Sequence, residues 1–374
     1  MALAYLFFHT KSSRTNAKEA MKVYFYHTQD LNYIHREWQA GRFPSHLLYG
    51  ACELPSEGID VVMHQHTDPK LPRWRRTLDV ARKILTCKEP FDAVYATKHN
   101  GLELIILLRA MGLFRKPVII WHHQPVPRQK NPLKKLLARF FYSGIDHAFM
   151  FSDNIVRESI ATGIIAPEKL QQCPWGADLD FYDRLMAANP VVHRDFISTG
   201  KERRDMPTLL SAFAECPGQR LLVIAPVDCC GVNYEEMFKV ERIPENVEIL
   251  INRTMWIPEL AQKIWHYGCI CICCEETNYT VGLTTLVEAL AFGIPVIISK
   301  NPNQPFDASE MRCGISVPYY DKDGWRDAIN AMAHDSDLLK SLGNNARQLA
   351  VSTYNIRNCA YIVAQRIIGC VAKA

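Results

Sequence analysis

Two series of short apolar runs, separated by stretches of helical periodicity, constrain the fold of this 374-residue chain more than any other feature. Runs of this length without polar alternation are typical of parallel strands that helices cover on both faces. They lie at residues 23–27, 59–65, 93–97, 118–123 and 148–151, and then at 196–199, 221–225, 247–251, 270–273 and 296–299. The pattern predicts an α/β protein with two doubly wound parallel sheets, whose ligands bind at the carboxyl ends of the strands in a cleft between the domains.

The length of the chain and a break in the pattern set the expected domain boundaries. A chain of 374 residues is too long for one ordinary core. We expect an N-terminal domain over residues 21–187 and a C-terminal domain over residues 188–355. Residues 1–20 precede the first natural strand and are interpreted as an extension.

Composition excludes several classes of protein. The formal net charge of +4 is small for this length, so a general nucleic-acid-binding surface is not expected. The thirteen cysteines lack a pair of CxxC motifs, which favours buried free thiols over a zinc site or a disulfide framework. Cys269, Cys271 and Cys273 alternate along one expected strand. No apolar run approaches the ~20 residues of a transmembrane helix.

The most informative motif follows the apolar run at 270–274. A loop leads into a helix that Gly293 and Pro295 close, since glycine takes the left-handed cap and proline cannot continue the helix. The unpaired N–H groups at the start of such a helix form an anion site. Thr284 and Glu288 are four residues apart, so a phosphate near Thr284 leaves Glu288 within reach of a ribose. The residues of this helix and of the loops before it that are expected to bind this nucleotide-like ligand are Gly200, Arg203, Glu276, Asn278, Gly282, Thr284, Thr285 and Glu288.

This segment resembles the donor-binding motif of retaining glycosyltransferases of the GT-B fold, the large family 4 and its relatives. In that family an acidic residue, a glycine, a helix N-terminus and a second glutamate hold the nucleotide diphosphate sugar. Glu288 matches the second glutamate. The family spacing places Thr280 at the first acidic position, with Glu275 and Glu276 a few residues earlier. Which of these three contacts the donor sugar stays open.

A cationic loop follows the apolar run at 196–199. The run ends at Gly200, and Lys201, Arg203 and Arg204 precede Asp205, a good helix N-cap. Cations held there would stabilise the charge that grows on a leaving diphosphate. In the resembled family a Gly-Arg loop followed by a lysine does this without a metal. The resemblance places Arg204 at the lysine and leaves Lys201 and Arg203 as alternatives for the arginine.

In the first half, His122 and His123 end the apolar run at 118–123. Polar residues at strand ends of a parallel sheet face the ligand cleft, and the resembled family often has a histidine here near the reacting sugar. The alternative is a pair of core histidines. We therefore expect the catalytic residues to be His122, His123, Lys201 and Arg204. Residues 98–101 are a weaker candidate of the same kind.

Residues 133–142 mix leucines and phenylalanines with lysines at helical spacing. Such a helix fits an anionic membrane surface. The alternative is a domain helix that packs its apolar side on the sheet. Residues 73–76 form a second basic-aromatic cluster.

The resemblance covers nearly the whole chain after Met21 and implies a GT-B fold whose last helix, within residues 356–374, crosses back onto the N-terminal domain. It implies transfer of a sugar from a UDP- or GDP-sugar to a glycan or lipid-linked acceptor, with retention, by front-face displacement and without metal or cofactor. Polysaccharide or glycoconjugate biosynthesis in the cytoplasm, with peripheral contact at the inner face of the plasma membrane, would follow. The alternatives are a nucleotide-sugar epimerase of the same fold and a non-catalytic sugar-nucleotide-binding protein.

Overall fold

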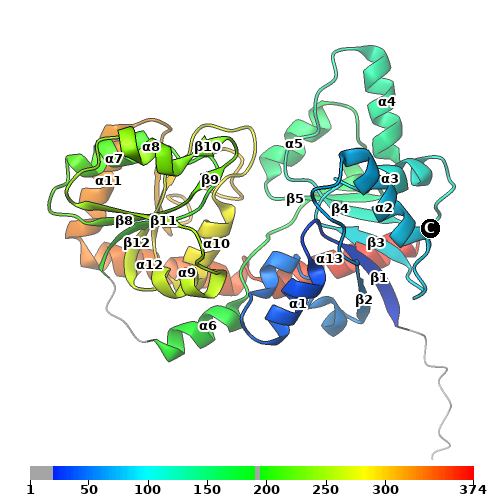
Figure 1. The fold of residues 1–374 in the computed structure, drawn as a ribbon, viewed down its shortest axis with the longest axis horizontal. Coiled ribbons are helices and arrows are strands. Elements are labelled where there is room, and N and C mark those ends of the chain that lie inside the picture. Colours follow the sequence, from blue (N-terminus) through cyan, green and yellow to red (C-terminus); the bar gives the residue numbers. More distant parts are fainter. Residues whose placement is uncertain (1–19, 190–193) are drawn as a thin grey trace, which may run out of the picture.

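The computed structural model describes residues 20–189 and 194–374, which form two domains, each built on a six-stranded parallel sheet (Figure 1). The expected extension at residues 1–20 lies almost wholly outside the described residues, as do residues 190–193, which follow shortly after the expected boundary between residues 187 and 188. The N-terminal sheet has the order β2-β1-β3-β4-β5-β6. Its strands are β1 (Met21–Tyr26), β2 (Ile59–Met63), β3 (Ala93–Ala96), β4 (Val118–Trp121), β5 (His147–Met150) and β6 (Leu170–Gln172).

The C-terminal sheet has the order β11-β8-β7-β12-β13-β14, which is the Rossmann order when its strands are counted from β7. Its strands are β7 (Arg194–Ser198), β8 (Leu221–Pro226), β11 (Val247–Asn252), β12 (Tyr267–Ile272), β13 (Val296–Ser299) and β14 (Gly314–Val317). A small antiparallel hairpin pairs β9 (Asp228–Cys229) with β10 (Val232–Asn233). Every predicted apolar run forms a strand, which confirms the fold class. The edge strands β6 and β14 were not predicted, because Leu-Gln-Gln and Gly-Ile-Ser-Val are too short and too polar to stand out.

Helices cover both sheets. Those before the boundary are α1 (Leu31–Gln39), α2 (Arg73–Leu85), α3 (Glu103–Ala110), α4 (Pro132–Ser143), α5 (Asp153–Ala161) and α6 (Leu179–Ala188), with short 3-10 turns at Ser45–Leu48, Leu54–Glu57 and Pro167–Lys169. Those after it are α7 (Met206–Ala214), α8 (Tyr234–Val240), α9 (Ile257–Ile264), α10 (Leu283–Phe292), α11 (Lys322–His334), α12 (Ser336–Ser352) and α13 (Ile356–Val371). In the part of the chain that the structure describes, none of these helices is long and apolar enough to span a membrane.

The cysteines follow the prediction of buried free thiols only in part. All thirteen are free thiols, but Cys230 is exposed and Cys52, Cys87, Cys229 and Cys370 are only partly buried. Cys269, Cys271 and Cys273 are buried in one apolar cluster with α7 and α11, because alternate residues of β12 point to the same side of the sheet. They therefore contribute to the core as small apolar side chains.

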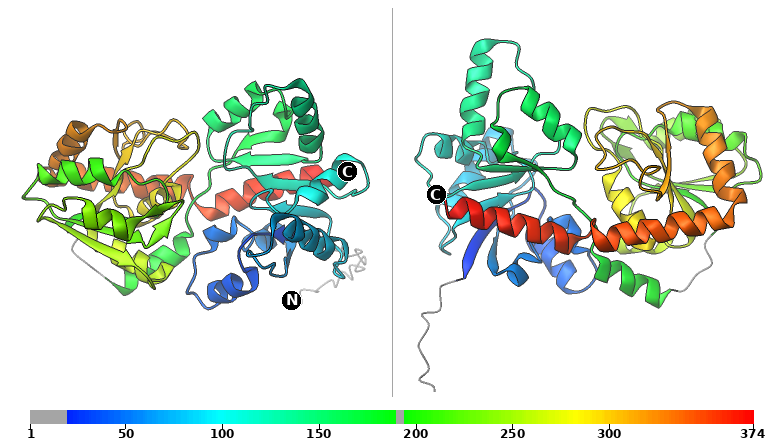
Figure 2. Two further views of the ribbon diagram at one scale, coloured as in Figure 1. Left: turned by 45° about the horizontal axis from the view of Figure 1, so that its top comes forward. Right: turned by 180° about the vertical axis from the view of Figure 1, so that it is seen from behind.

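The last helix joins the two domains. α12 packs on α10 in the C-terminal domain, and α13 packs on β3 and on the turn at Leu54–Glu57 in the N-terminal domain (Figure 2). Asn355 caps α13 at the break between them, and the Ile356 N–H donates to the Ala177 carbonyl at 2.9 Å. This arrangement confirms that the C-terminal helix crosses back.

Two contacts show that the carboxyl edges of the sheets face each other. At the start of α5, after β5, Asn154 donates from Nδ2 to Oδ1 of Asn303, after β13, at 2.8 Å. On the other side, the ring of Tyr33 in α1 lies 5.5 Å from that of Trp256, which precedes α9. Both contacts join segments that follow strands, either the loop or the first turn of the next helix. Ligands bound at the two edges therefore lie in one region between the domains.

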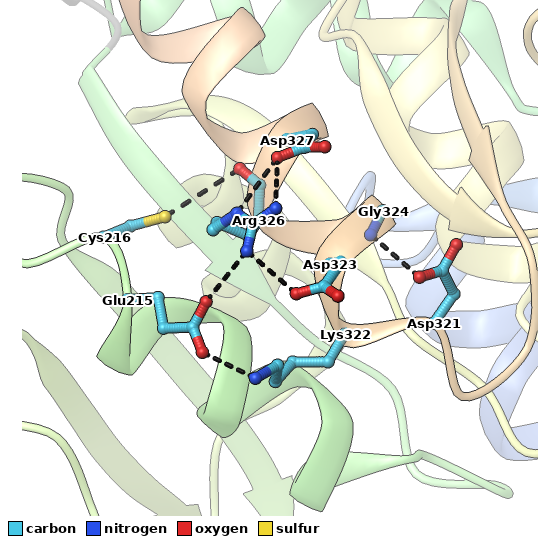
Figure 3. A network of polar contacts seen from close by, with 8 residues as sticks. All are labelled: Glu215, Cys216, Asp321, Lys322, Asp323, Gly324, Arg326 and Asp327. Carbon is cyan, nitrogen blue, oxygen red and sulfur yellow. Dashed lines mark hydrogen bonds and ion pairs between the residues drawn. The ribbon is translucent and has the colours of Figure 1, made fainter.

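Ion pairs on the surface of the C-terminal domain join α7 to α11 (Figure 3). Glu215, at the end of α7, lies 2.6 Å from Lys322 Nζ and 3.1 Å from Arg326 Nη1 of α11. Asp321 caps α11 by accepting a hydrogen bond from the Gly324 N–H at 2.9 Å. These charged groups remain accessible to solvent, which screens them, so the ion pairs contribute little to stability. The buried contacts of α11 with α7 carry most of the packing energy.

Candidate functional site

The loops after β7 and β12 lie side by side at the point where the strand order of the C-terminal sheet reverses, the topological switch point. An antiparallel bridge pairs Arg204 with Cys274, and the Glu275 N–H donates to the Arg203 carbonyl at 2.9 Å. Asp205 closes the first loop by capping α7, accepting from the Thr208 N–H at 3.2 Å, as expected. Open α/β sheets bind ligands at this position.

Arg204 is the most unusual residue of this edge. It is 5% exposed, and its guanidinium donates to the carbonyl oxygens of Thr199 and Glu202 at 3.0 and 3.1 Å. Nη1 also lies 3.1 Å from the Cys274 sulfur. Among the described residues no carboxylate pairs with Arg204. An uncompensated buried charge is costly, so this guanidinium points to an anionic ligand.

Two glycines in the left-handed region hold the guanidinium between them. A Cβ at Gly200 (φ +101°) would lie 1.9 Å from Arg204 Nη2, and a Cβ at Gly282 (φ +83°) would lie 3.6 Å from Nη1. Gly282 is also the N-cap of α10 and has no side chain to accept from the first amides of that helix. These N–H groups therefore stay available to a ligand. We call Gly200, Arg204, Gly282 and the first turn of α10 the Arg204 cradle.

The structure brings only some of the expected α10 residues to the cradle. Thr284 is exposed on the first turn, whereas Thr285 is buried. Glu288 lies one turn further along and is buried, and Gly293 ends the helix at φ +67°, as predicted.

Burial raises the pKa of Glu288 to about 7, and the nearby Tyr182 of α6 lowers it only partly. The Tyr182 hydroxyl is buried without a hydrogen bond of ordinary geometry to any described residue. The carboxyl of Glu288 and this hydroxyl thus adjoin each other where α10 meets α6.

The remaining candidate residues for binding the sugar donor, together with Lys201, lie at the solvent-exposed rim of the Arg204 cradle. Lys201, Arg203, Glu276 and Asn278 are exposed, and Arg203 Nη1 lies 3.3 Å from Oε2 of Glu275. Since Arg203 is paired and Arg204 is not, the two arginines have different environments.

The three candidates for the sugar-contacting residue also differ. Thr280 donates from Oγ1 to the Asn303 carbonyl at 2.6 Å, and Glu275 is paired with Arg203. Within the described residues, the Glu276 side chain makes no polar contact. Of the three candidates, Glu276 can therefore contact a ligand without first breaking a hydrogen bond or an ion pair.

The two histidines after β4 have different surroundings. His122 is buried, with Nδ1 2.5 Å from the Gln124 carbonyl oxygen and Nε2 2.9 Å from the Tyr142 hydroxyl. His123 is half-buried and uses Nε2 on the Thr97 carbonyl oxygen at 2.8 Å, while its ring stacks on Tyr49. Burial lowers the pKa of both to about 4, so both are neutral near pH 7. His123 is the better candidate for contact with a ligand, since one ring nitrogen is uncommitted.

Sequence reasoning missed the residues that brace the acidic loop. Asn301 donates from Nδ2 to the Tyr279 carbonyl at 2.9 Å, and Gln304 donates from Nε2 to the Val281 carbonyl at 2.5 Å. The sequence signal that could have identified them is the run of polar residues directly after β13, at the carboxyl edge of the sheet. Tyr182 was also missed as a neighbour of Glu288, because their contact joins two domains. No group of three or more potential metal ligands occurs within residues 20–189 and 194–374.

Comparison with known proteins defines the class of this fold. Sucrose-phosphate synthase from Thermosynechococcus elongatus superposes with a TM-score of 0.68, at 15% identity, over 94% of this chain and 99% of that one. A glycosyltransferase from Rickettsia africae gives 0.66 at 13% identity, over 96% and 100%. Anabaena Alr3699/HepE in complex with UDP and glucose gives 0.62 at 15% identity, over 93% and 99%. The chain therefore has the GT-B fold.

A family model matches part of the chain. Residues 207–349, from α7 to α12, match the family described as Glycosyl transferases group 1. The matched segment contains Gly282 and Glu288 and begins just after Arg204. A comparison with curated protein sequences gave no match.

Proposed function

We propose that this protein is a retaining glycosyltransferase that moves a sugar from a UDP- or GDP-sugar to a glycan or lipid-linked acceptor without a metal. The observation that carries the proposal is the unpaired, buried Arg204 guanidinium between Gly200 and Gly282. A diphosphate supplies the missing negative charge. The match of residues 207–349 to group 1 glycosyl transferases and the UDP bound to Alr3699/HepE support a nucleotide-sugar donor.

In this proposal the Arg204 cradle acts on the leaving group. The guanidinium and the first amides of α10 contact the diphosphate, whose charge increases as the glycosidic bond breaks, so they stabilise the transition state more than the ground state. Lys201 adds charge at the rim, and Glu276 is available to the sugar. Glu288 accepts hydrogen bonds from the ribose. His123 is neutral, so it orients the sugar or acceptor by hydrogen bonding, and the leaving phosphate takes the acceptor proton.

For the acceptor side, we propose that α4 contacts an anionic membrane. Leu133, Leu136 and Leu137 are 60–64% exposed, so the helix leaves much of its apolar surface uncovered. Lys134, Lys135 and Arg139 lie on the same helix, and residues 128–142 contain no acidic residue. Such a helix binds anionic interfaces. The thirteen free thiols fit a reducing cytoplasm, and we place the enzyme at the inner face of the plasma membrane.

A screen of UDP-, GDP- and ADP-sugars for thermal stabilisation tests donor binding, since a ligand that binds the folded state raises stability by mass action. The preferred nucleotide sugar should then release nucleoside diphosphate when an acceptor is present, at the same rate with EDTA. Activity that disappears on chelation and returns with magnesium contradicts the metal-free mechanism. Interconversion of nucleotide sugars without an acceptor indicates an epimerase. Binding without any turnover indicates a non-catalytic protein.

A further inference from the structure

An apolar groove of about 590 Å³ runs between α2 and α3 on the N-terminal domain. Trp74 and Leu78 of α2 and Leu104 and Leu107 of α3 supply its walls. Its volume lies within the ~300–1,000 Å³ of small-molecule sites, which are also mainly apolar. Trp74 is 61% exposed and Leu78 51% exposed, so an apolar ligand in the groove would remove substantial apolar surface from water.

Further cationic side chains lie near the end of the groove at the carboxyl edge, beyond the residues that line it. At this end of the groove, Arg73 Nη2 and Thr77 Oγ1 both lie 3.0 Å from the carboxylate of Glu103, so the charge of Arg73 and that of Glu103 neutralise each other. The loop after β3 adds Lys98 and His99, and both Arg73 and Glu103 lie close enough to His99 to influence its pKa.

Two cations at this end are left without an anion. Lys98 is half-buried, and burial together with the nearby Arg76 lowers the pKa of its amine. In the described structure neither Lys98 nor Arg76 forms an ion pair. Arg76 Nε is buried and has no hydrogen-bond partner among the residues that the structure describes. We call Arg76, Lys98 and His99 the Lys98 recess.

The Lys98 recess adjoins the histidines of the candidate active site. The His99 ring stacks on that of His122 at 5.4 Å, and Lys98 contributes to the lowered pKa of His123. His99 also contacts Phe141 of α4, with ring centroids 6.4 Å apart. One end of the groove is thus close to His123, and the recess is linked to the helix proposed to contact the membrane.

The same side of the domain carries a concentration of exposed apolar side chains. α2, α3 and α4 lie together on the N-terminal domain (Figures 1 and 2). Their exposed side chains and those of the turn after α3 are Trp74, Leu78, Leu85, Met111, Leu113, Leu133, Leu136, Leu137 and Phe140. A membrane lying on this side is adjacent to the groove.

We infer that the groove and the Lys98 recess bind a phosphate ester of a long hydrocarbon chain, with the phosphate on Arg76, Lys98 and His99 and the chain along Trp74, Leu78, Leu104 and Leu107. An anionic head and an apolar tail match the cationic end and the apolar walls. This inference rests on the proposed function and assigns the acceptor to the lipid phosphates.

Calorimetry with the full-length protein and farnesyl phosphate tests the inference. We expect farnesyl phosphate to bind at least tenfold more tightly than farnesol, which lacks the phosphate, or inorganic phosphate, which lacks the hydrocarbon chain. Lys98→Gln and Leu78→Asp should each weaken binding about tenfold. Lys88→Gln and Leu85→Asp are matched controls, since Leu85 is 54% exposed on the same helix but does not line the groove. Both controls should bind as the unmodified protein does.

Equal affinity for farnesol, equal loss in Leu85→Asp and Leu78→Asp, or no binding of farnesyl phosphate would each overturn the inference. Binding of inorganic phosphate as tight as that of farnesyl phosphate would show a simple anion site and would also overturn it. Nucleotide-sugar binding is measured on the same samples. If the nucleotide sugar binds and turns over while farnesyl phosphate does not bind, only this inference fails. If no nucleotide binds, the proposed function fails first.

Discussion

The carboxyl edges of the two sheets present different chemistry to the region between them. In the C-terminal domain the Arg204 cradle is buried, glycine-lined and positively charged. In the N-terminal domain His123 is neutral, its ring stacks on Tyr49 and lies edge-on to Phe151, and the cations Arg76 and Lys98 lie further along the edge. The first edge suits an anion whose charge changes during the reaction. The second suits a ligand held by ring contacts and hydrogen bonds.

The same contrast appears in how the two edges are built. The cradle comes from two loops that end neighbouring strands and from one helix N-terminus. The N-terminal edge combines the turn at residues 45–50, the ends of β3, β4 and β5, and the helices α2 and α3. Charge stabilisation needs few groups held firmly, whereas acceptor recognition uses a wide surface.

The largest expected effect separates Arg204 from its neighbour. Arg204→Ala should lower kcat by about 100- to 1,000-fold and change the donor KM much less, because the guanidinium faces charge that grows in the transition state. Steady-state kinetics measures both constants. Arg203→Ala is the control, since Arg203 is exposed and paired with Glu275. A larger loss of kcat in Arg203→Ala than in Arg204→Ala would move the functional cation from the cradle to the rim.

The next effect tests whether the N-terminal domain alone contacts lipid. Replacing Lys134 and Lys135 with Glu should weaken binding to anionic vesicles by at least about thirtyfold, since each basic residue near such a surface contributes about 1 kcal/mol and each new carboxylate is repelled. Sedimentation with vesicles at low salt measures it, and higher salt should release the unmodified protein. The same reversal at Lys239 and Lys340 of the C-terminal domain should have little effect. Failure of the unmodified protein to sediment would make α4 an ordinary domain helix.

A third prediction concerns the carboxyl of Glu288. Because burial raises its pKa to about 7, the ionised form that accepts ribose hydrogen bonds best is lost as the pH falls below 7. Nucleotide affinity should therefore decrease about tenfold from pH 8 to pH 6. Glu288→Ala should bind about tenfold more weakly at pH 8, and calorimetry measures both effects.

Glu288→Gln is the control for this pH dependence and should remove most of it. The raised pKa also means that the folded state binds an extra proton between pH 4.5 and 7, so Glu288 lowers stability as the pH rises through that range. Glu288→Gln should flatten this slope in thermal unfolding. Unchanged affinity in Glu288→Ala would remove the residue from the donor site.

The smallest expected effect distinguishes the paired histidines of the N-terminal edge. His123→Ala should lower turnover by about tenfold or less with little change in nucleotide affinity, as loss of one neutral hydrogen bond predicts. His122→Ala should instead lower thermal stability, because it leaves the buried Tyr142 hydroxyl without its partner. Measuring the turnover and the melting temperature of both variants tests these two assignments. If His122→Ala loses more turnover at unchanged stability, the assignments are reversed.

Much of the local structure around the Arg204 cradle could be predicted because its signals are local. Asp205 as an N-cap and the end of α10 at Gly293 follow from residues a few positions apart, and both are confirmed. The strands follow from apolar runs, and the crossing helix α13 from the family resemblance. The edge strands carry no such local pattern, and the polar run that contains Asn301 and Gln304 does not specify the distant carbonyls to which they donate.

What the sequence determined by itself is therefore the periodic part of the protein: parallel strands, the helices between them and the helix N-terminus at Gly282. Short-range hydrogen bonds and the burial of apolar runs fix these elements whatever lies further along the chain. The tertiary structure alone decided that Arg204 lies unpaired against Cys274, 70 residues away, and that Glu288 lies beside Tyr182. The charge and hydration of a side chain depend on such distant neighbours, which no local pattern specifies.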